Sequence, residues 1–202
     1  FIMNNFEIKN ILFQNIKSNS KVYKLLNNFN NSITYSTINY SVLSVSYTNN
    51  FPANFTHFVY RQRRRLNRII KKHEHECSML IVNDVDTFDK YLEDVKYLVK
   101  SMIDRGIRSP DFLPEYSLMR ELIKKNNLYM SILKYNEEIA NSIKKNICAI
   151  SFYFKEDNDV SFWIDLYDNL SMINIYHNTL LIKTFTEDNN KRSNEIVKFN
   201  FG

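Results

Sequence analysis

The feature that most constrains the fold is a change in the spacing of apolar residues along the chain. In residues 87–105 apolar side chains recur every three to four positions, which predicts an α-helix with one buried face. Asp86 is placed to cap this helix at its start, and Gly106 stands at the C′ position where a helix ends. Further helices are predicted at about 115–126 and about 128–145. The middle of the chain is therefore predicted to be helical.

In the last third of the chain, apolar and polar residues alternate instead. Three segments, ICAISFYFK, VSFWIDLYD and MINIYHNTLLIKTF, are separated by short polar turns and predict three antiparallel strands. Residues 33–48 are β-branched and aromatic, which predicts a further strand or hairpin, and residues 77–82 predict a short buried strand. The expected fold class is α+β, with central helices and an antiparallel C-terminal β-meander.

The domain organisation follows from composition. Residues 1–32 are rich in Asn, Ser and Lys and are predicted to form an N-terminal helical or extended arm. Residues 33–202 are predicted to be a single α+β domain, because a chain with 44% hydrophobic residues can bury a sizeable core. No apolar run approaches the roughly 18 residues of a membrane span. The two cysteines, without a CxxC motif, favour a reducing compartment.

Glycine is scarce, and this scarcity excludes several classes of enzyme. The chain has only Gly106 and Gly202. Loops that cradle phosphates need glycines at fixed spacing, so P-loop, Rossmann and kinase sites are excluded. A nucleophile elbow of the form G-x-S-x-G is also absent from the sequence. We therefore predict a protein that is not an enzyme, with no catalytic residues and no cofactor.

The most unusual local feature is a basic run, YRQRRRLNRIIKKHEHEC, at residues 60–77. Residues 61–76 hold seven basic and two acidic residues, so their net charge of +5 equals the formal charge of the whole chain. Five of the nine arginines fall between Arg61 and Arg68, although lysine is the commoner cation. Arginine presents a planar fork that suits phosphate. A basic patch focused in this way is typical of nucleic-acid contacts.

The basic run is predicted to lie on a helix over residues 54–73 and to contact RNA. Its cations would neutralise phosphates, and nearby rings would stack on unpaired bases. The predicted RNA-binding residues are Arg61, Arg63, Arg64, Arg65, Arg68, Lys71, Lys72, His57 and Tyr60. Two other interpretations stay open. In the first, the run is a solvated helix face that pairs with the acidic segment from Asp84 to Asp94. In the second, the run contacts an anionic membrane surface or an acidic partner.

Two smaller clusters have a structural and a chemical interpretation each. In an extended segment, His73, His75 and Cys77 would face one side and offer three zinc ligands, but their spacing is not that of a zinc motif. We therefore predict no metal site. Asp84 and Asp86 follow an apolar stretch, as carboxylates that bind Mg²⁺ do, and they equally suit the positive end of the next helix. A metal-dependent nuclease is the least favoured function.

The coding background completes the functional prediction. Asn occurs 28 times and glycine twice, which indicates an AT-rich genome such as that of an organelle, a parasite or a virus. We predict a non-catalytic, RNA-binding structural subunit of a large ribonucleoprotein, an organellar ribosomal protein that contacts rRNA and neighbouring proteins in the mitochondrial matrix. The alternative is a protein–protein interaction module, viral or parasitic and cytoplasmic, that binds no nucleic acid.

Overall fold

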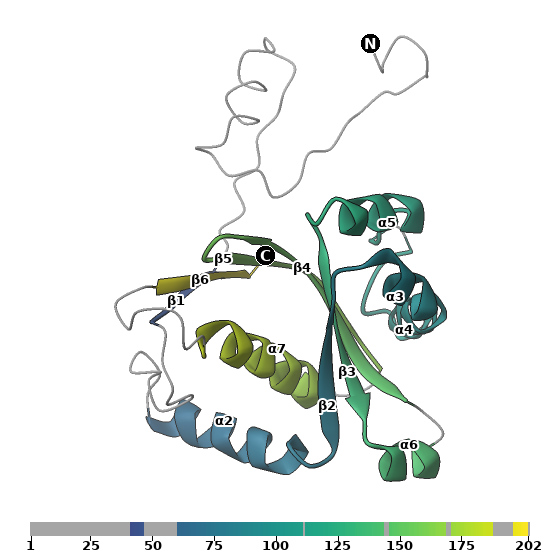
Figure 1. Ribbon diagram of the computed structural model, residues 1–202. Coiled ribbons are helices and arrows are strands. Elements are labelled where there is room, and N and C mark those ends of the chain that lie inside the picture. The colour runs from purple at the N-terminus through teal and green to yellow at the C-terminus, as the bar shows by residue number, and fades with distance from the viewer. Residues whose placement is uncertain are drawn as a thin grey trace. The chain divides into compact units, whose positions relative to one another are not determined.

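The computed structural model describes one early strand and most of the chain from residue 60 onward (Figure 1). The described residues are 41–46, 60–110, 112–143, 146–168, 171–187 and 196–201. They belong to one compact unit, Tyr40–Phe201. The predicted arm, residues 1–32, lies outside the described residues, so the boundary between arm and domain stays a prediction.

Helices and strands both contribute to this unit, which confirms the α+β fold class. The strands are β1 (Ser41–Ser46), β2 (Cys77–Val82), β3 (Tyr129–Tyr135), β4 (Ile147–Glu156), β5 (Asp159–Tyr167) and β6 (Ile196–Phe201). The helices are α2 (Tyr60–His73), α3 (Val85–Lys90), α4 (Leu92–Asp104), α5 (Tyr116–Lys124), α6 (Glu137–Ile143) and α7 (Ser171–Thr186).

The strands form one sheet in the order β1-β6-β5-β4-β3-β2. Neighbouring strands are antiparallel except β5 and β6, which are parallel. Parallel neighbours need a crossover connection, and α7 provides it by returning along the sheet from the end of β5 to the start of β6.

Helices cover both faces of the sheet (Figure 1). On one face α3, α4 and α5 pack around a core that includes Phe88, Leu98 and Ile132, each fully buried. On the other face α7 packs on β4, β5 and β6. The basic helix α2 lies against α7, and Ile69 and Tyr176 are buried in the core cluster that both helices share. The core clusters between the helices and the sheet are apolar, and burial of apolar surface is the dominant stabilising term.

Residues 128–145 are not the helix that the spacing of apolar residues predicts. They form β3 and the short helix α6. Four successive residues of β3, Met130 to Leu133, are buried, because helices cover both faces of the strand. A strand covered on both faces reads as a continuous apolar run instead of an alternation, so its apolar positions also fit a helical spacing.

The predicted third strand of the C-terminal meander is also wrong, because residues 171–186 form helix α7. The first two strands of that meander, β4 and β5, are confirmed as an antiparallel hairpin. Helix α7 is buried around much of its circumference, including the polar residues His177, Thr179 and Thr186. A helix without a solvated face lacks the apolar stripe by which helices are predicted.

Several of the remaining elements follow the sequence prediction, whereas strand β6 was not predicted. The helix predicted at 87–105 is present as α3 and α4, with a break at Tyr91. Asp84 caps it, and not Asp86 as predicted. Gly106 has φ +68°, a left-handed conformation that ends the helix as predicted. No helix in the part of the chain that the structure describes is long and apolar enough to cross a membrane.

Candidate functional site

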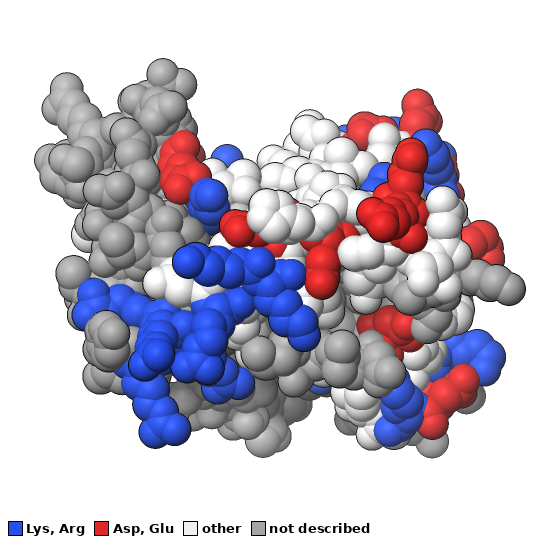
Figure 2. All heavy atoms as spheres, turned by 90° about the horizontal axis from the view of Figure 1, so that it is seen from below, with Lys and Arg blue, Asp and Glu red and all other residues white. Residues whose placement is uncertain are grey.

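The basic run of the sequence lies on α2, where its charges gather on one exposed surface (Figure 2). The exposed cations, which we call the α2 basic surface, are Arg61, Arg64, Arg65, Arg68, Lys71 and Lys72. The opposite side of α2 packs inward through Ile69. Arg63 is half-buried, and its Nε is buried without a hydrogen-bond partner. The separation of charge from apolar contact shows that these cations are presented to solvent.

Two residues of the predicted RNA-binding set are not placed by the structure. His57 lies outside the described residues, and Tyr60 begins α2 with a side chain that is not described. The remaining members are brought together on one helix. RNA as their partner stays a prediction.

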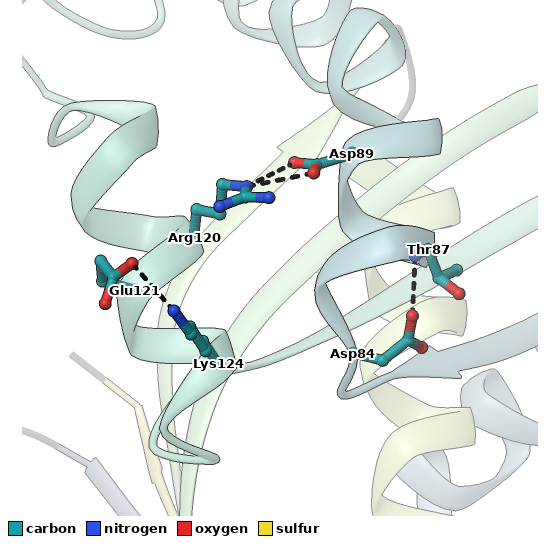
Figure 3. Close-up of polar contacts among 6 residues, drawn as sticks. All are labelled: Asp84, Thr87, Asp89, Arg120, Glu121 and Lys124. Atoms are coloured by element: carbon teal, nitrogen blue, oxygen red, sulfur yellow. Dashed lines mark hydrogen bonds and ion pairs between the residues drawn. The ribbon is translucent and has the colours of Figure 1, made fainter.

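The acidic segment that follows β2 is engaged away from α2 (Figure 3). Asp84 Oδ1 accepts a hydrogen bond from the backbone N–H of Thr87 at 2.7 Å, and this bond lowers the pKa of Asp84. Arg120 Nε donates to both carboxylate oxygens of Asp89, at 3.1 and 3.0 Å. These contacts give Asp84 the role of a helix cap and Asp89 a partner on α5. The interpretation of Asp84 as a residue that stabilises the start of the next helix therefore holds.

The HEHEC segment does not converge on a common point. His73 ends α2 and is buried, with Nδ1 at 2.7 Å from Glu76 Oε2, whereas the side chain of His75 is 87% exposed. Cys77 begins β2 and is buried. Within the described residues no group of three or more His, Cys, Asp or Glu side chains is arranged to hold a metal ion.

Cys77 instead meets a second buried thiol, Cys148, with the two sulfur atoms 3.9 Å apart. A hydrogen bond between the thiols lowers the pKa of Cys77 and raises that of Cys148, and burial raises the latter further. The two residues lie on β2 and β4, which β3 separates. Two strand spacings place their backbones about 9 to 10 Å apart, beyond the reach of a disulfide.

A buried polar row crosses the sheet beneath α7, and the sequence analysis missed it. Ser131 of β3, Ser151 of β4 and Asp165 of β5 are neighbours in the strand register. From α7, His177 Nε2 lies 2.9 Å from Ser131 Oγ, and its Nδ1 lies 3.3 Å from Ser151 Oγ. Asn178 Nδ2 donates to Asp165 Oδ2 at 2.9 Å. The members come from four elements, so no spacing in the sequence marks them.

Burial sets the chemistry of this row. Desolvation lowers the pKa of His177 to about 4, although the nearby charge of Asp165 raises it in part. The imidazole is therefore neutral at pH 7, with one nitrogen donating and the other accepting. Ser131, Ser151 and His177 are fully buried, so neither hydroxyl is open to a substrate. In this arrangement the row anchors α7 to the sheet, and its two half-buried members, Asp165 and Asn178, lie at the border of the core.

Next to this row, β5 has an edge that no described strand covers. Its pairing with β6 ends at Phe162 and Phe201. From Trp163 to Tyr167 no described strand pairs with that edge of β5, and Arg105 Nη2 donates a hydrogen bond to the carbonyl oxygen of Tyr167 at 2.6 Å. An open strand edge offers backbone donors and acceptors to an extended ligand. Asp165 lies in the middle of this stretch, under α7.

No protein-family model and no curated protein matches this chain. Solved structures do match it in fold. One is the C-terminal DUF2156 domain of a protein from Agrobacterium fabrum assigned as a lysylphosphatidylglycerol synthetase, at 8% identity and a TM-score of 0.52. Another is FemX, also at 8% identity and a TM-score of 0.52. Both alignments cover 80% of this chain.

The first of these structures is named as a domain of a synthetase, and the second is named FemX. This chain spans about half of each, 45% of the former and 52% of the latter. At this identity the similarity establishes the fold alone. It corrects the functional prediction: the solved structures that share this fold are a synthetase domain and FemX and not ribosomal proteins, so the predictions of a non-catalytic ribosomal protein, and of a protein that is not an enzyme, are contradicted. Scarce glycine excluded particular phosphate-binding loops, but it did not exclude a fold that binds substrates by other means.

Proposed function

We propose that this chain is an acyl-transfer domain that acts on a phosphate-bearing substrate. The observation that carries the proposal is the sheet itself: a mostly antiparallel sheet with one parallel pair, β5 and β6, bridged by α7, in a fold shared with two acyltransferase-type structures. Acyl transfer needs the donor's acyl group to be held extended against fixed hydrogen-bonding groups while the acceptor approaches. The open edge of β5 from Trp163 to Tyr167 has these properties.

Helix α2, which carries the α2 basic surface, packs against α7, the helix that bridges β5 and β6. His73, in the last turn of α2, contacts the ring of Tyr176 with centroids 5.4 Å apart, and Tyr176 precedes His177 of the polar row. Lys71 and Lys72 occupy that same last turn of α2 and are exposed. A substrate at the β5 edge therefore has cations on the adjoining helix for its phosphate group.

The name of one structural neighbour fits this chemistry. A lysylphosphatidylglycerol synthetase joins, by its name, a lysyl group to a phosphate-bearing lipid. For this chain we propose only the shared chemistry, an acyl group and a phosphate-bearing substrate. The phosphate can be part of a nucleotide thioester, an aminoacylated RNA or a lipid head group, and the experiment below separates these three sources.

The test is a transfer assay with acetyl-coenzyme A or lysyl-RNA as donor and with butylamine or phosphatidylglycerol vesicles as acceptor. The variant Arg64→Gln/Arg68→Gln removes two exposed charges of the α2 basic surface. We expect the KM of the phosphate-bearing substrate to rise roughly five- to thirtyfold, since two exposed charge contacts are worth about 1 to 2 kcal/mol together. We expect kcat to change little, because these contacts are remote from the reacting bond.

The matched control is Lys96→Gln/Lys100→Gln, which removes two exposed cations from α4, on the other face of the sheet. We expect the KM of this control to equal that of the unmodified chain. A rise in KM that is the same in both variants would show that the α2 basic surface does not bind the substrate. Absence of transfer above the protein-free background, with every donor and acceptor, would contradict the proposed function.

A further inference from the structure

Two buried oxygen atoms near the junction of β5 and α7 have no hydrogen-bond partner. They are Asp165 Oδ1 and Asn174 Oδ1. The other carboxylate oxygen of Asp165 accepts from Asn178 Nδ2 at 2.9 Å, so the side chain is already held in place. Buried acceptors are nearly always satisfied in proteins, and an exception is explained by strain, by a functional role, or by a water molecule, an ion or a ligand that donates to it. This junction is therefore a place where a ligand with N–H or O–H donors fits.

The geometry of α7 places the two asparagines on one side. Asn174 and Asn178 are four residues apart, so they lie on the same face of the helix. Asn178 contacts Asp165, which shows that this face is turned to β5. Because α7 runs back along the sheet from the end of β5, Asn174 lies one turn nearer to that end. All three residues are half-buried, at the border between core and surface.

The missing donor does not come from the buried polar row. Both ring nitrogens of His177 are directed to hydroxyl groups, Nε2 to Ser131 and Nδ1 to Ser151. The Ser151 hydroxyl also lies 3.5 Å from Asn178 Oδ1, a long and weak contact that leaves this oxygen with spare capacity. Asp165 lies in the stretch of β5 whose edge no described strand covers. Among the described residues, this edge of β5 is therefore the side on which we place the approach of a ligand to these oxygens.

We infer that Asp165, Asn174 and Asn178 form a binding site for a primary ammonium group. An ammonium group has one positive charge and three N–H donors. The cluster offers one carboxylate and three acceptor oxygens with free capacity: Asp165 Oδ1, Asn174 Oδ1 and Asn178 Oδ1. A charge-assisted hydrogen bond to the carboxylate is stronger than one between neutral groups. A divalent metal ion is disfavoured, because one carboxylate and two amides are a weakly charged ligand set.

This inference deepens the proposed function and rests on it, since the ammonium group would belong to the amine that receives the acyl group. Before transfer the ammonium group passes one proton to the Asp165 carboxylate, and the free amine then forms the amide bond as the thiol of coenzyme A or the hydroxyl of the RNA leaves with a proton. The site lies at the open edge of β5, which is where we place the acyl group. The proposal concerns binding of the amine and can be tested without any acyl donor.

The experiment titrates the isotope-labelled chain with butylammonium chloride at constant ionic strength and follows the side-chain amide signals of Asn174 and Asn178 by NMR. Tetramethylammonium chloride carries the same charge without an N–H donor, and 1-butanol carries a donor without a charge. We expect saturable shifts with butylammonium at about millimolar concentration, as for a small ligand with few contacts. We expect no saturable shift with the other two.

The decisive variant is Asp165→Asn, which removes the charge and leaves an oxygen to accept from Asn178. We expect butylammonium to bind at least tenfold more weakly to it. The matched control is Asp168→Asn, because Asp168 is the next carboxylate along the chain and lies near Tyr97 and Ser101 of α4 instead. We expect this control to bind as the unmodified chain does. Should Asp165→Asn fail to fold, Asn174→Ala serves, with an expected loss of at least threefold.

Equal binding of tetramethylammonium and butylammonium would overturn the inference, because the site would then recognise the positive charge alone and not the N–H donors. Unchanged binding in Asp165→Asn would overturn it as well. The two proposals fail separately. Binding of butylammonium without any acyl transfer would sustain this site and contradict the proposed function, whereas transfer without such binding would contradict this site alone.

Discussion

The buried His177 makes a quantitative prediction about stability and pH. Its side chain is fully buried, and burial holds its pKa at about 4 in the folded chain. In the unfolded chain the pKa returns to about 6.5. Between these two values the unfolded state binds a proton that the folded state does not, so the free energy of unfolding falls as the pH falls. The contribution of His177 is complete above about pH 6.5 and is lost as the pH approaches 4.

The size of the effect follows from the same two pKa values. They differ by roughly 2.5 pH units, and each unit corresponds to about 1.4 kcal/mol, so the full loss is about 3 kcal/mol. About 2 kcal/mol of this is expected between pH 6.5 and pH 5. That is a large fraction of the stability of an ordinary domain.

The assay is urea denaturation at several pH values between 7 and 4.5, on the unmodified chain and on His177→Gln. The substitution itself destabilises the chain at every pH, because it disturbs the contacts with Ser131 and Ser151. The prediction concerns the slope with pH: the unmodified chain loses about 2 kcal/mol more than the variant between pH 6.5 and pH 5. His75→Gln is the control, since His75 is exposed and should not change the slope. Parallel curves for the unmodified chain and His177→Gln would refute the reasoning.

Three further substitutions test the fold by the same denaturation assay. Phe88→Ala should cost about 3 to 5 kcal/mol, because Phe88 is fully buried, whereas Leu118→Ala, at a half-exposed position, should cost much less; equal losses would contradict the assigned core. Gly106→Ala should cost about 1 kcal/mol or more, because an alanine is strained at φ +68°, and an unchanged midpoint would contradict that conformation. Asp84→Ala should destabilise α3 by removing the cap on Thr87 N–H, with a loss that shrinks in acid as the unmodified Asp84 becomes protonated; a loss independent of pH would contradict the role of the carboxylate.

Local signals in the sequence predicted several elements correctly. The spacing of apolar residues predicts the amphipathic α2, the strand β2 and the hairpin of β4 and β5. The end of α4 is predicted by Gly106, because glycine adopts the left-handed conformation found there. Helix α2 has one solvated face and Gly106 gives α4 a definite end, whereas β4, whose first seven residues are buried, is bounded by the polar turn that leads into β5. For such elements the pattern of apolar residues is enough.

The errors have a common physical cause. Strand β3 and helix α7 both lie in the interior, with Met130 to Leu133 buried in one and Tyr176 and His177 buried in the other. An element without a solvated face has no polar side to set its period, so tertiary packing and not local pattern decides its structure. The same interior location hid the polar row, whose members meet only after folding.

The functional prediction went wrong at a different step. The basic run predicts helix α2 correctly, but the scarcity of glycine excludes only particular phosphate-binding loops and not every enzyme. A fold can bind substrates through a strand edge and through side chains on helices, and neither has a signature in the spacing of residues. Asp165 could not be singled out from the sequence, because its hydrogen-bond partner, Asn178, comes from a segment that the sequence predicted to be a strand.

The most direct test of the account is to incubate the purified chain with butylamine and either acetyl-coenzyme A or lysyl-RNA, and to look for the acylated amine by mass spectrometry. The account predicts an amide product that accumulates in proportion to the amount of chain, is strongly reduced by Asp165→Asn and is unaffected by Asp168→Asn. No amide product from either donor, with a chain shown to be folded, would contradict the assignment of acyl transfer to this site.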